Sequence, residues 1–130
     1  MLMDEICYVC NRANGRLFHR DTGLKWCAKC AQFSNNLKQN YGITIDDYKT
    51  MLKRQHDRCA ICKALANECR LPGPIERYGL VVDHCHETNT VRGLLCNHCN
   101  RMLGASRDSI ATLWKAIRYL SLSNPEKQTN

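Results

Sequence analysis

Four Cys-x-x-Cys pairs divide the chain and constrain its fold more than any other feature. They are Cys7/Cys10, Cys27/Cys30, Cys59/Cys62 and Cys96/Cys99. The two-residue gap lets both sulfurs of a tight turn face one ion, and two such turns complete a tetrahedral zinc site. A chain of 130 residues buries only a modest core, so metal staples would add needed stability. The sequence therefore predicts a small protein built around two structural Zn²⁺ ions.

The cysteines also bear on the cellular compartment, because ten of them could form disulfides in a secreted protein. The acidic start, Met1 to Glu5, has no basic region followed by an apolar run, so we expect no signal peptide. No stretch approaches the roughly 20 apolar residues of a membrane span. We therefore expect a cytoplasmic protein whose cysteines bind metal. Cys69 and Cys85 have no zinc partner in this scheme, and we treat both as free thiols.

The spacing of the pairs predicts how the chain is organised. Sixteen residues separate Cys10 from Cys27, which fits a four-cysteine zinc ribbon with short hairpins at its turn signals, Asn14-Gly15 and Asp21-Thr22-Gly23. Thirty-three residues lie between Cys62 and Cys96, so further structure must fold there. We divide the chain into an N-terminal ribbon (1–36), a connecting helical segment (37–58), a zinc-bound core (59–104), a C-terminal amphipathic helix (105–124) and a polar tail (125–130).

Three helices are expected outside the core motif. The stretch from Ala31 to Tyr41 is followed by Gly42, which can end a helix. Thr44 and Asp47 resemble a capping box, and the apolar stripe of the helix they begin, 45–55, should pack on the core. The last helix is amphipathic, with Ser106 or Asp108 as its cap. Its apolar positions are Ile110, Leu113, Trp114, Ile117 and Leu120.

The insert between the second two cysteine pairs predicts a hairpin followed by a short helix. An irregular loop at Leu71–Pro74 precedes a strand at Leu80–Val82, and a second strand covers Val91–Leu95. Residues 87–90 supply the turn, and a helix should follow Cys99 and end near Gly104. The predicted fold class is thus α+β, small and zinc-stapled.

The run Asp83-His84-Cys85-His86 ends the first of these strands. Alternation along a strand puts His84 and His86 on one face and Asp83 on the other, unless a bulge brings Asp83 back. The return strand then places Asn100 on a helix across the hairpin. The residues alone leave three readings open: a catalytic site, structural histidines, or a metal-binding run of its own.

The segment Val81-Val82-Asp83-His84-Cys85-His86, with Val91-Arg92-Gly93-Leu94-Leu95-Cys96-Asn97-His98-Cys99-Asn100, resembles the recombination endonuclease VII family of bacteriophages. That family belongs to the HNH, or ββα-metal, nucleases. The resemblance covers roughly 41–122, and the N-terminal ribbon resembles an extra zinc module of some relatives. Where the family often has Asp between the two histidines, this chain has Cys85.

The resemblance implies a role for each residue of the motif. Asp83 and Asn100 would bind a catalytic Mg²⁺ or Mn²⁺, and His84 would be the general base that activates water. His86 would lie near the scissile phosphate. The structural zinc of this core would be held by Cys59, Cys62, Cys96 and Cys99, and a second zinc by Cys7, Cys10, Cys27 and Cys30 of the ribbon. Arg92 and Arg101 are our candidates for contacts to DNA.

The net charge of +7 weakly favours a polyanionic partner, but two zinc ions on eight thiolates would lower it to about +3. Our principal hypothesis is a metal-dependent DNA endonuclease acting in the cytoplasm of the bacterial host of a phage or prophage. Branched DNA such as the four-way (Holliday) junction is the substrate the family implies, and cutting both strands calls for a homodimer. The alternatives are a nicking enzyme on ordinary duplex and a non-catalytic zinc module that binds DNA. Basic residues flank the ribbon cysteines, so we expect that module to contact DNA; they are Arg12, Arg16, Arg20, Lys25 and Lys29.

Overall fold

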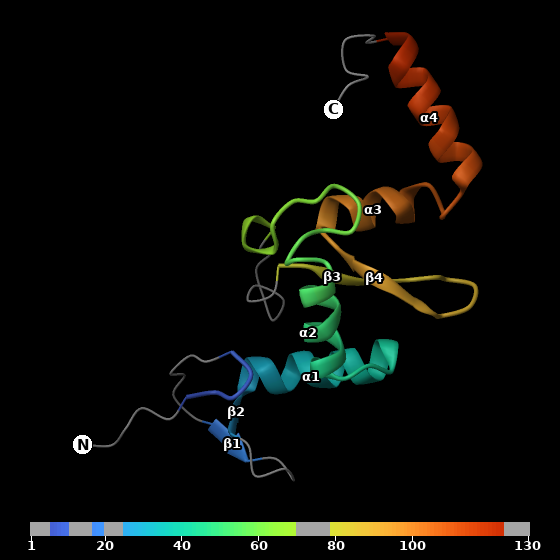
Figure 1. Ribbon diagram of the computed structural model, residues 1–130. Helices are drawn as coiled ribbons and strands as arrows, with labels where there is room; N and C mark the ends of the chain where they lie inside the picture. Colours follow the sequence, from blue (N-terminus) through green and yellow to red (C-terminus); the bar gives the residue numbers. More distant parts are fainter. Residues whose placement is uncertain (1–5, 11–16, 20–24, 70–78, 124–130) are drawn as a thin grey trace.

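The computed structural model describes residues 6–10, 17–19, 25–69 and 79–123. Within them lie two antiparallel hairpins and four α-helices, which confirms the α+β class (Figure 1). The elements are β1 (Leu17–His19), β2 (Lys25–Cys27), α1 (Ala28–Tyr41), α2 (Ile45–Arg54), a 3-10 turn η1 (Ala66–Glu68), β3 (Val81–His84), β4 (Val91–Leu95), α3 (Asn97–Ala105) and α4 (Ile110–Ser123). No helix in these ranges is both long and apolar enough to cross a bilayer.

Helix α1 begins earlier than the sequence predicted. Cys27 occupies its N-cap position, so the helix starts at Ala28 and carries Cys30 in its first turn. Gly42 ends it in the left-handed conformation at φ 67°, as expected, and its N–H bonds to the last carbonyls of the helix. The β1–β2 hairpin confirms the predicted short hairpin between the ribbon cysteines. The turn signals at 14–15 and 21–23, the loop at 71–74 and the tail at 125–130 lie outside the described residues.

Helix α2 begins with the predicted capping box. The Asp47 N–H donates to Thr44 Oγ1 over 3.1 Å, and the Thr44 N–H donates to Asp47 Oδ2 over 2.8 Å. These bonds hold the pKa of Asp47 below its usual range. On the core side, the buried Tyr48 packs edge-on against Phe33 and donates its hydroxyl to the Leu80 carbonyl over 2.6 Å. The predicted structural role of α2 is confirmed, since the helix links α1 to the start of β3.

The β3–β4 hairpin is held from one side by Gln55, which follows α2. The Gln55 Nε2 donates to the Leu94 carbonyl over 2.9 Å, and the Leu94 N–H donates to Gln55 Oε1 over 2.9 Å. One side chain therefore pairs both the N–H and the carbonyl of Leu94 on this edge, as a neighbouring strand would. The Ala60 N–H adds a bond to the same carbonyl. Gly93 lies beside this clamp, and a Cβ there would come within 3.1 Å of Gln55 Oε1.

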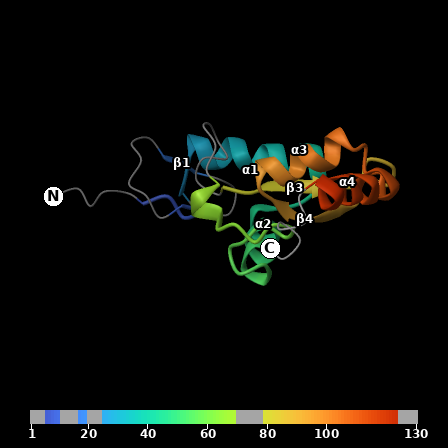
Figure 2. The same ribbon diagram turned by 90° about the horizontal axis from the view of Figure 1, so that it is seen from above.

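The two C-terminal helices, α3 and α4, begin at positions other than those that the sequence predicted. Cys96 is the N-cap of α3, so the helix starts at Asn97 rather than after Cys99 and runs one residue past Gly104. The predicted caps of α4 were wrong. Ser109 caps it by accepting from the Thr112 N–H over 3.2 Å, while Ser106 donates to the Leu103 carbonyl. Figure 1 shows α4 projecting away from the body, and Figure 2 shows the same chain from above.

The Gln55 clamp can be tested by the substitution Gln55→Ala. It removes the partner of the Leu94 N–H and leaves the Leu94 carbonyl with the Ala60 N–H, so we expect the free energy of unfolding to fall by about 1–3 kcal/mol. Gln39→Ala on the exposed face of α1 is the matched control and should change it by under about 0.5 kcal/mol. Chemical denaturation of the zinc-loaded protein measures both. Equal stability of the two variants would contradict the clamp.

Candidate active site and zinc sites

Eight cysteines form the two clusters that their spacing predicted. Within each cluster the four sulfurs lie within 4.8 Å of one another. The Sγ–Sγ separations are 4.0 Å for Cys10 and Cys27 and 3.7 Å for Cys62 and Cys96. A tetrahedral zinc ion with Zn–S bonds of about 2.3 Å sets its sulfurs about 3.8 Å apart. All ten cysteines are free of disulfides, so both clusters have the donor set and the size to hold structural zinc.

The electrostatics of the clusters also favour a cation. Burial raises the pKa of Cys7 and of Cys59, but backbone N–H donors outweigh it and lower both to about 6. At Cys7 one such donor is the Cys27 N–H, at 3.3 Å. Burial and the neighbouring sulfurs instead raise the pKa of Cys99 far above its usual value. Four thiolates this close need a positive ion among them to be ionised together.

The second cluster fixes a helix to the hairpin. Cys59 and Cys62 lie in a turn that pairs with β4 through the Ala60 N–H, while Cys96 and Cys99 begin α3. The Cys99 N–H donates to the Cys96 sulfur over 3.4 Å, so this ligand is also the side-chain cap of the helix. Helix α3 packs on both strands. A metal here would therefore set the position of α3 relative to the hairpin without taking part in chemistry.

Zinc content provides the test of these sites. Elemental analysis should find two zinc ions per chain, and Cys62→Ser should lose one of them and lower the melting temperature by several degrees or more. Cys69→Ser is the matched control. Cys69 is half-buried and belongs to neither cluster, so its replacement should retain both ions. Two retained ions in Cys62→Ser would show that the four sulfurs are not one site.

The hairpin carries a bulge where the Asp83–His86 run begins. Asp83 pairs with Gly93, but His84 pairs with Val91, so Arg92 is an extra residue in β4. The bulge brings Asp83 and Arg92 together. The Arg92 Nε donates to Asp83 Oδ2 over 2.7 Å, and its Nη2 donates to Oδ1 over 2.9 Å. Among the described residues Asp83 is the one buried charged side chain, 8% exposed.

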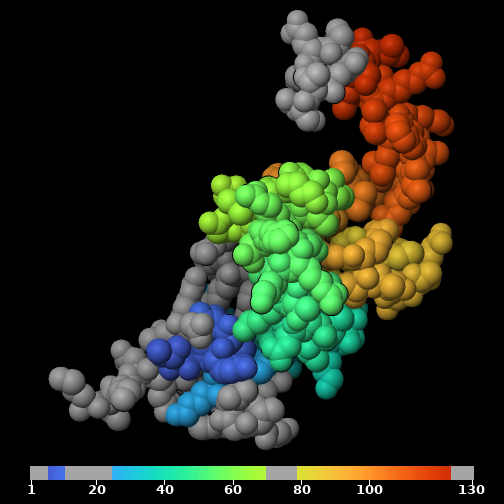
Figure 3. Space-filling view, in the orientation of Figure 1, coloured from blue at the N-terminus to red at the C-terminus, as the bar shows by residue number. Residues whose placement is uncertain are grey.

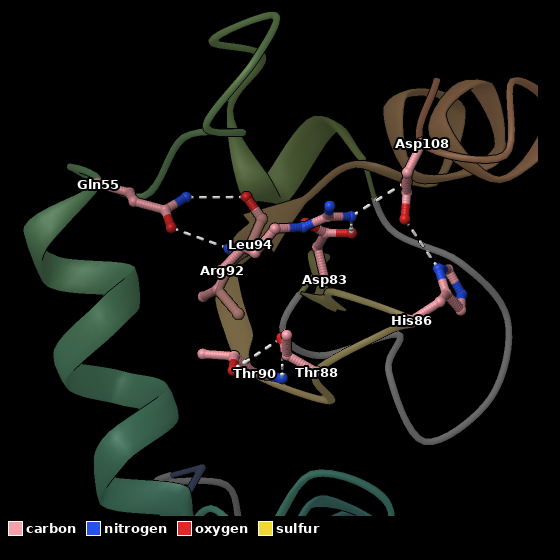
Figure 4. A network of polar contacts seen from close by, with 8 residues as sticks. All are labelled: Gln55, Asp83, His86, Thr88, Thr90, Arg92, Leu94 and Asp108. Carbon is pink, nitrogen blue, oxygen red and sulfur yellow. Dashed lines mark hydrogen bonds and ion pairs between the residues drawn. The ribbon is translucent and has the colours of Figure 1, made fainter. Parts of the chain in front are cut away.

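A chain of polar contacts leads from Asp83 to the turn before α4 (Figure 4). Nη2 of Arg92 also donates to Asp108 Oδ1 over 3.2 Å. The other oxygen of Asp108 lies 3.0 Å from Nδ1 of His86. A hydrogen bond from His86, with the larger effect, and one from Arg92 hold the pKa of Asp108 below its usual range. Sequence reasoning had assigned Asp108 to a helix cap and missed this role, because the contacts join positions far apart in the sequence.

The two histidines of the motif lie side by side, as alternation predicted. The ring centroids of His84 and His86 are 4.9 Å apart, and Tyr41 at the end of α1 packs 5.4 Å from His84. Nothing in the residue pattern pointed to Tyr41 as a neighbour of the site.

Asn100 lies on the helix that packs on the hairpin. It is half-buried in the first turn of α3, which covers the hairpin, and Arg101 beside it is exposed. The side chains in direct contact are thus Asp83, Arg92, Asp108 and His86, with His84 against His86. Asn100 and Arg101 lie on the neighbouring helix.

A cavity of about 460 Å³ opens beside this network. It is lined by Cys85, His86, Glu87, Arg92, Gly104, Arg107 and Asp108. The two arginines and the histidine supply N–H donors to a space large enough for a phosphate and its neighbours. This zinc-braced hairpin and helix, with an acidic and imidazole cluster at the bulge, is an arrangement suited to phosphodiester chemistry.

Comparison with known proteins agrees with that description. The model of the recombination endonuclease VII family matches residues 34–122, so the chain belongs to this family. It is 39% identical over 103 residues to the Gene 59 protein of Mycobacterium phage D29, covering 78% of this chain and 56% of that protein. The Gene 59 protein of Mycobacterium phage L5 is 46% identical over 103 residues, 78% of this chain and 57% of its own length. No solved structure matches the chain.

The comparisons confirm the resemblance seen in the sequence and extend it seven residues toward the N-terminus, into α1. The chain spans somewhat more than half the length of these phage relatives. Family membership points to a nuclease.

Proposed function

We propose that this protein is a metal-dependent DNA endonuclease of the HNH type that hydrolyses phosphodiester bonds. The observation that carries the proposal is the buried Asp83 at the bulged end of β3, followed in the chain by His84, whose ring lies against that of His86, in a chain of the endonuclease VII family. A non-catalytic zinc module has no need of a buried carboxylate at the end of a strand that also carries paired imidazoles. We assign the protein to the cytoplasm of a bacterial host, as its phage relatives suggest.

The donor set fits a hard divalent cation. Asp83 offers a carboxylate and Asn100 an amide oxygen, the ligand types that Mg²⁺ and Mn²⁺ take, with phosphate and water completing the shell. When bound there, the cation would stabilise negative charge on the phosphate and on the leaving 3′ oxygen.

The chain's own side chains perform the remaining steps. His84 takes the proton of the attacking water, for which a neutral imidazole suits physiological pH. His86 orients the phosphate or contacts the leaving group. The nearby cavity, lined by His86 and Arg92, would receive the backbone of the DNA, with Arg101 as a further phosphate contact on α3.

A cleavage assay tests the enzyme and its base together. Wild type should cut a supercoiled plasmid or a synthetic four-way junction with Mg²⁺ or Mn²⁺ and not with EDTA at constant zinc loading. His84→Ala should lower the rate by about 100-fold or more, because it removes the general base. The control His56→Asn removes an exposed imidazole at φ 53°, a conformation that Asn accepts, and should retain activity. Cleavage by His84→Ala at the wild-type rate would refute the assignment.

The two substrates in that assay separate the finer possibilities. A preference for the junction would identify a resolvase of branched DNA, and equal or faster nicking of plasmid would identify an enzyme of ordinary duplex. If the zinc-loaded wild type binds DNA but does not cleave it, the protein is a non-catalytic zinc module that binds DNA.

We propose further that two copies of the chain associate through α4. None of its residues is buried, although it carries large apolar side chains, and it stands clear of the body (Figure 3). The apolar stripe consists of Ile110, Trp114, Ile117 and Leu120, which are 52–72% exposed. A second copy is the occupant we favour, because cutting both strands at one place requires two sites related by a two-fold axis.

Sedimentation velocity tests this association. Wild type should sediment as a dimer at micromolar concentration, and Ile117→Asp should sediment as a monomer because it buries a charge in the contact. Lys115→Asp, on the opposite face of α4, should remain dimeric. A wild-type monomer throughout the concentration range would exclude the second copy as the partner of α4.

A further inference from the structure

We propose that Arg92 holds the place of the catalytic cation at Asp83, and that Asp108 receives Arg92 when the cation binds. Arg92 is then a positioning residue that sets the affinity of the site for its metal. The inference rests on the proposed function in one respect, that Asp83 is a ligand of the cation. It adds two side chains whose effects on metal binding have opposite signs.

The first observation is that Arg92 uses both oxygens of Asp83. Its Nε and Nη2 donate to Oδ2 and Oδ1 over 2.7 and 2.9 Å, the forked pairing that an arginine makes with a carboxylate. A cation such as Mg²⁺ binds a carboxylate oxygen at about 2.1 Å. Since Asp83 is almost fully buried, the cation approaches from the side that the guanidinium occupies, and Arg92 must release at least one oxygen.

The second observation is that the receiving carboxylate is already in contact. The same Nη2 that binds Asp83 lies 3.2 Å from Oδ1 of Asp108. His86 holds the other oxygen of Asp108, which turns Oδ1 toward Arg92 (Figure 4). Arg92 and Asp108 both line the cavity of about 460 Å³, so the guanidinium has space on that side. The guanidinium of Arg92 can therefore exchange Asp83 for Asp108 by a movement of its own side chain.

The charges explain why Arg92 pairs with Asp83 in the absence of a cation and with Asp108 when a cation is bound. Without a cation, a buried carboxylate needs a positive partner, and Arg92 supplies it. A divalent cation on Asp83 makes this position positive, so a guanidinium beside it is repelled. Asp108, 23% exposed and anionic, is the neighbouring group that then attracts Arg92. Glu87 and Arg107, which carry opposite charges, also line the cavity.

The proposal predicts opposite effects for the two partners. Arg92→Ala frees Asp83 and should tighten binding of Mn²⁺ in the absence of DNA by about fivefold or more. Asp108→Asn removes the receiving charge, so Arg92 stays on Asp83 and Mn²⁺ should bind about fivefold more weakly. In the Arg92→Ala background, Asp108→Asn should have almost no effect, because no guanidinium remains to be transferred.

The experiment measures Mn²⁺ binding to the zinc-loaded full chain without DNA, by loss of the free-ion electron paramagnetic resonance signal. Glu87→Gln is the matched control, because it removes one negative charge from the same cavity without touching Arg92. A weakening in Asp108→Asn that exceeds that in Glu87→Gln and vanishes in the double variant supports the transfer. A weakening that persists unchanged in the double variant overturns it, as does weaker binding in folded Arg92→Ala.

A further variant separates this inference from the proposed function. Asp83→Asn should abolish the Mn²⁺ site. If Asp83→Asn binds Mn²⁺ as wild type does, the assignment of Asp83 as a ligand fails. If Asp83→Asn loses the site while Arg92→Ala does not bind more tightly, the ligand assignment stands and the place-holding role of Arg92 fails. Should Arg92→Ala not fold, Arg92→Gln, which removes the charge and retains most of the side chain, replaces it in every arm.

Discussion

The cluster of Cys59, Cys62, Cys96 and Cys99 is the constraint on which the β3–β4 hairpin and helix α3 depend. The β3–β4 sheet has only two strands, too few for stability alone. The cluster ties one strand-flanking turn to the N-terminus of α3, while the Gln55 side chain replaces a missing third strand along Leu94. A small chain can thus hold the polar network around Asp83 on short elements, because the sulfur ligands and the Gln55 amide fix in place what a larger sheet would otherwise hold.

A second constraint is electrostatic. Burying Asp83 would cost several kcal/mol if its charge were unpaired, and the bulge in β4 supplies Arg92 at the required place. The same bulge orders the remaining polar groups, because Arg92 reaches Asp108 and Asp108 reaches His86. One extra residue in a strand therefore accounts for most of the geometry of the site.

Sequence patterns predicted the elements whose causes are local. The capping box at Thr44, the αL glycine at 42 and the strand Val91–Leu95 were found where expected, since each depends on near neighbours in the chain. The sulfur clusters were also predictable, because zinc imposes a fixed spacing on its ligands. The contact of Asp108 with Arg92 was not, since it depends on where α3 ends and how the turn that follows is folded. The Gln55 clamp was missed for the same reason: it joins positions 39 residues apart.

The turn between α3 and α4 places Arg107 and Asp108 in the left-handed region, at φ 53° and 55°, a conformation that most side chains adopt at some cost. Asp108 has its N–H on the Leu103 carbonyl and its carboxylate on Arg92 and His86, and α4 begins two residues later. The direction in which α4 leaves the body and the charge balance around Asp83 are consequently set by one turn. A complex assembled through α4 would transmit the geometry of its assembly directly to the polar network around Asp83, with no separate signalling element between them.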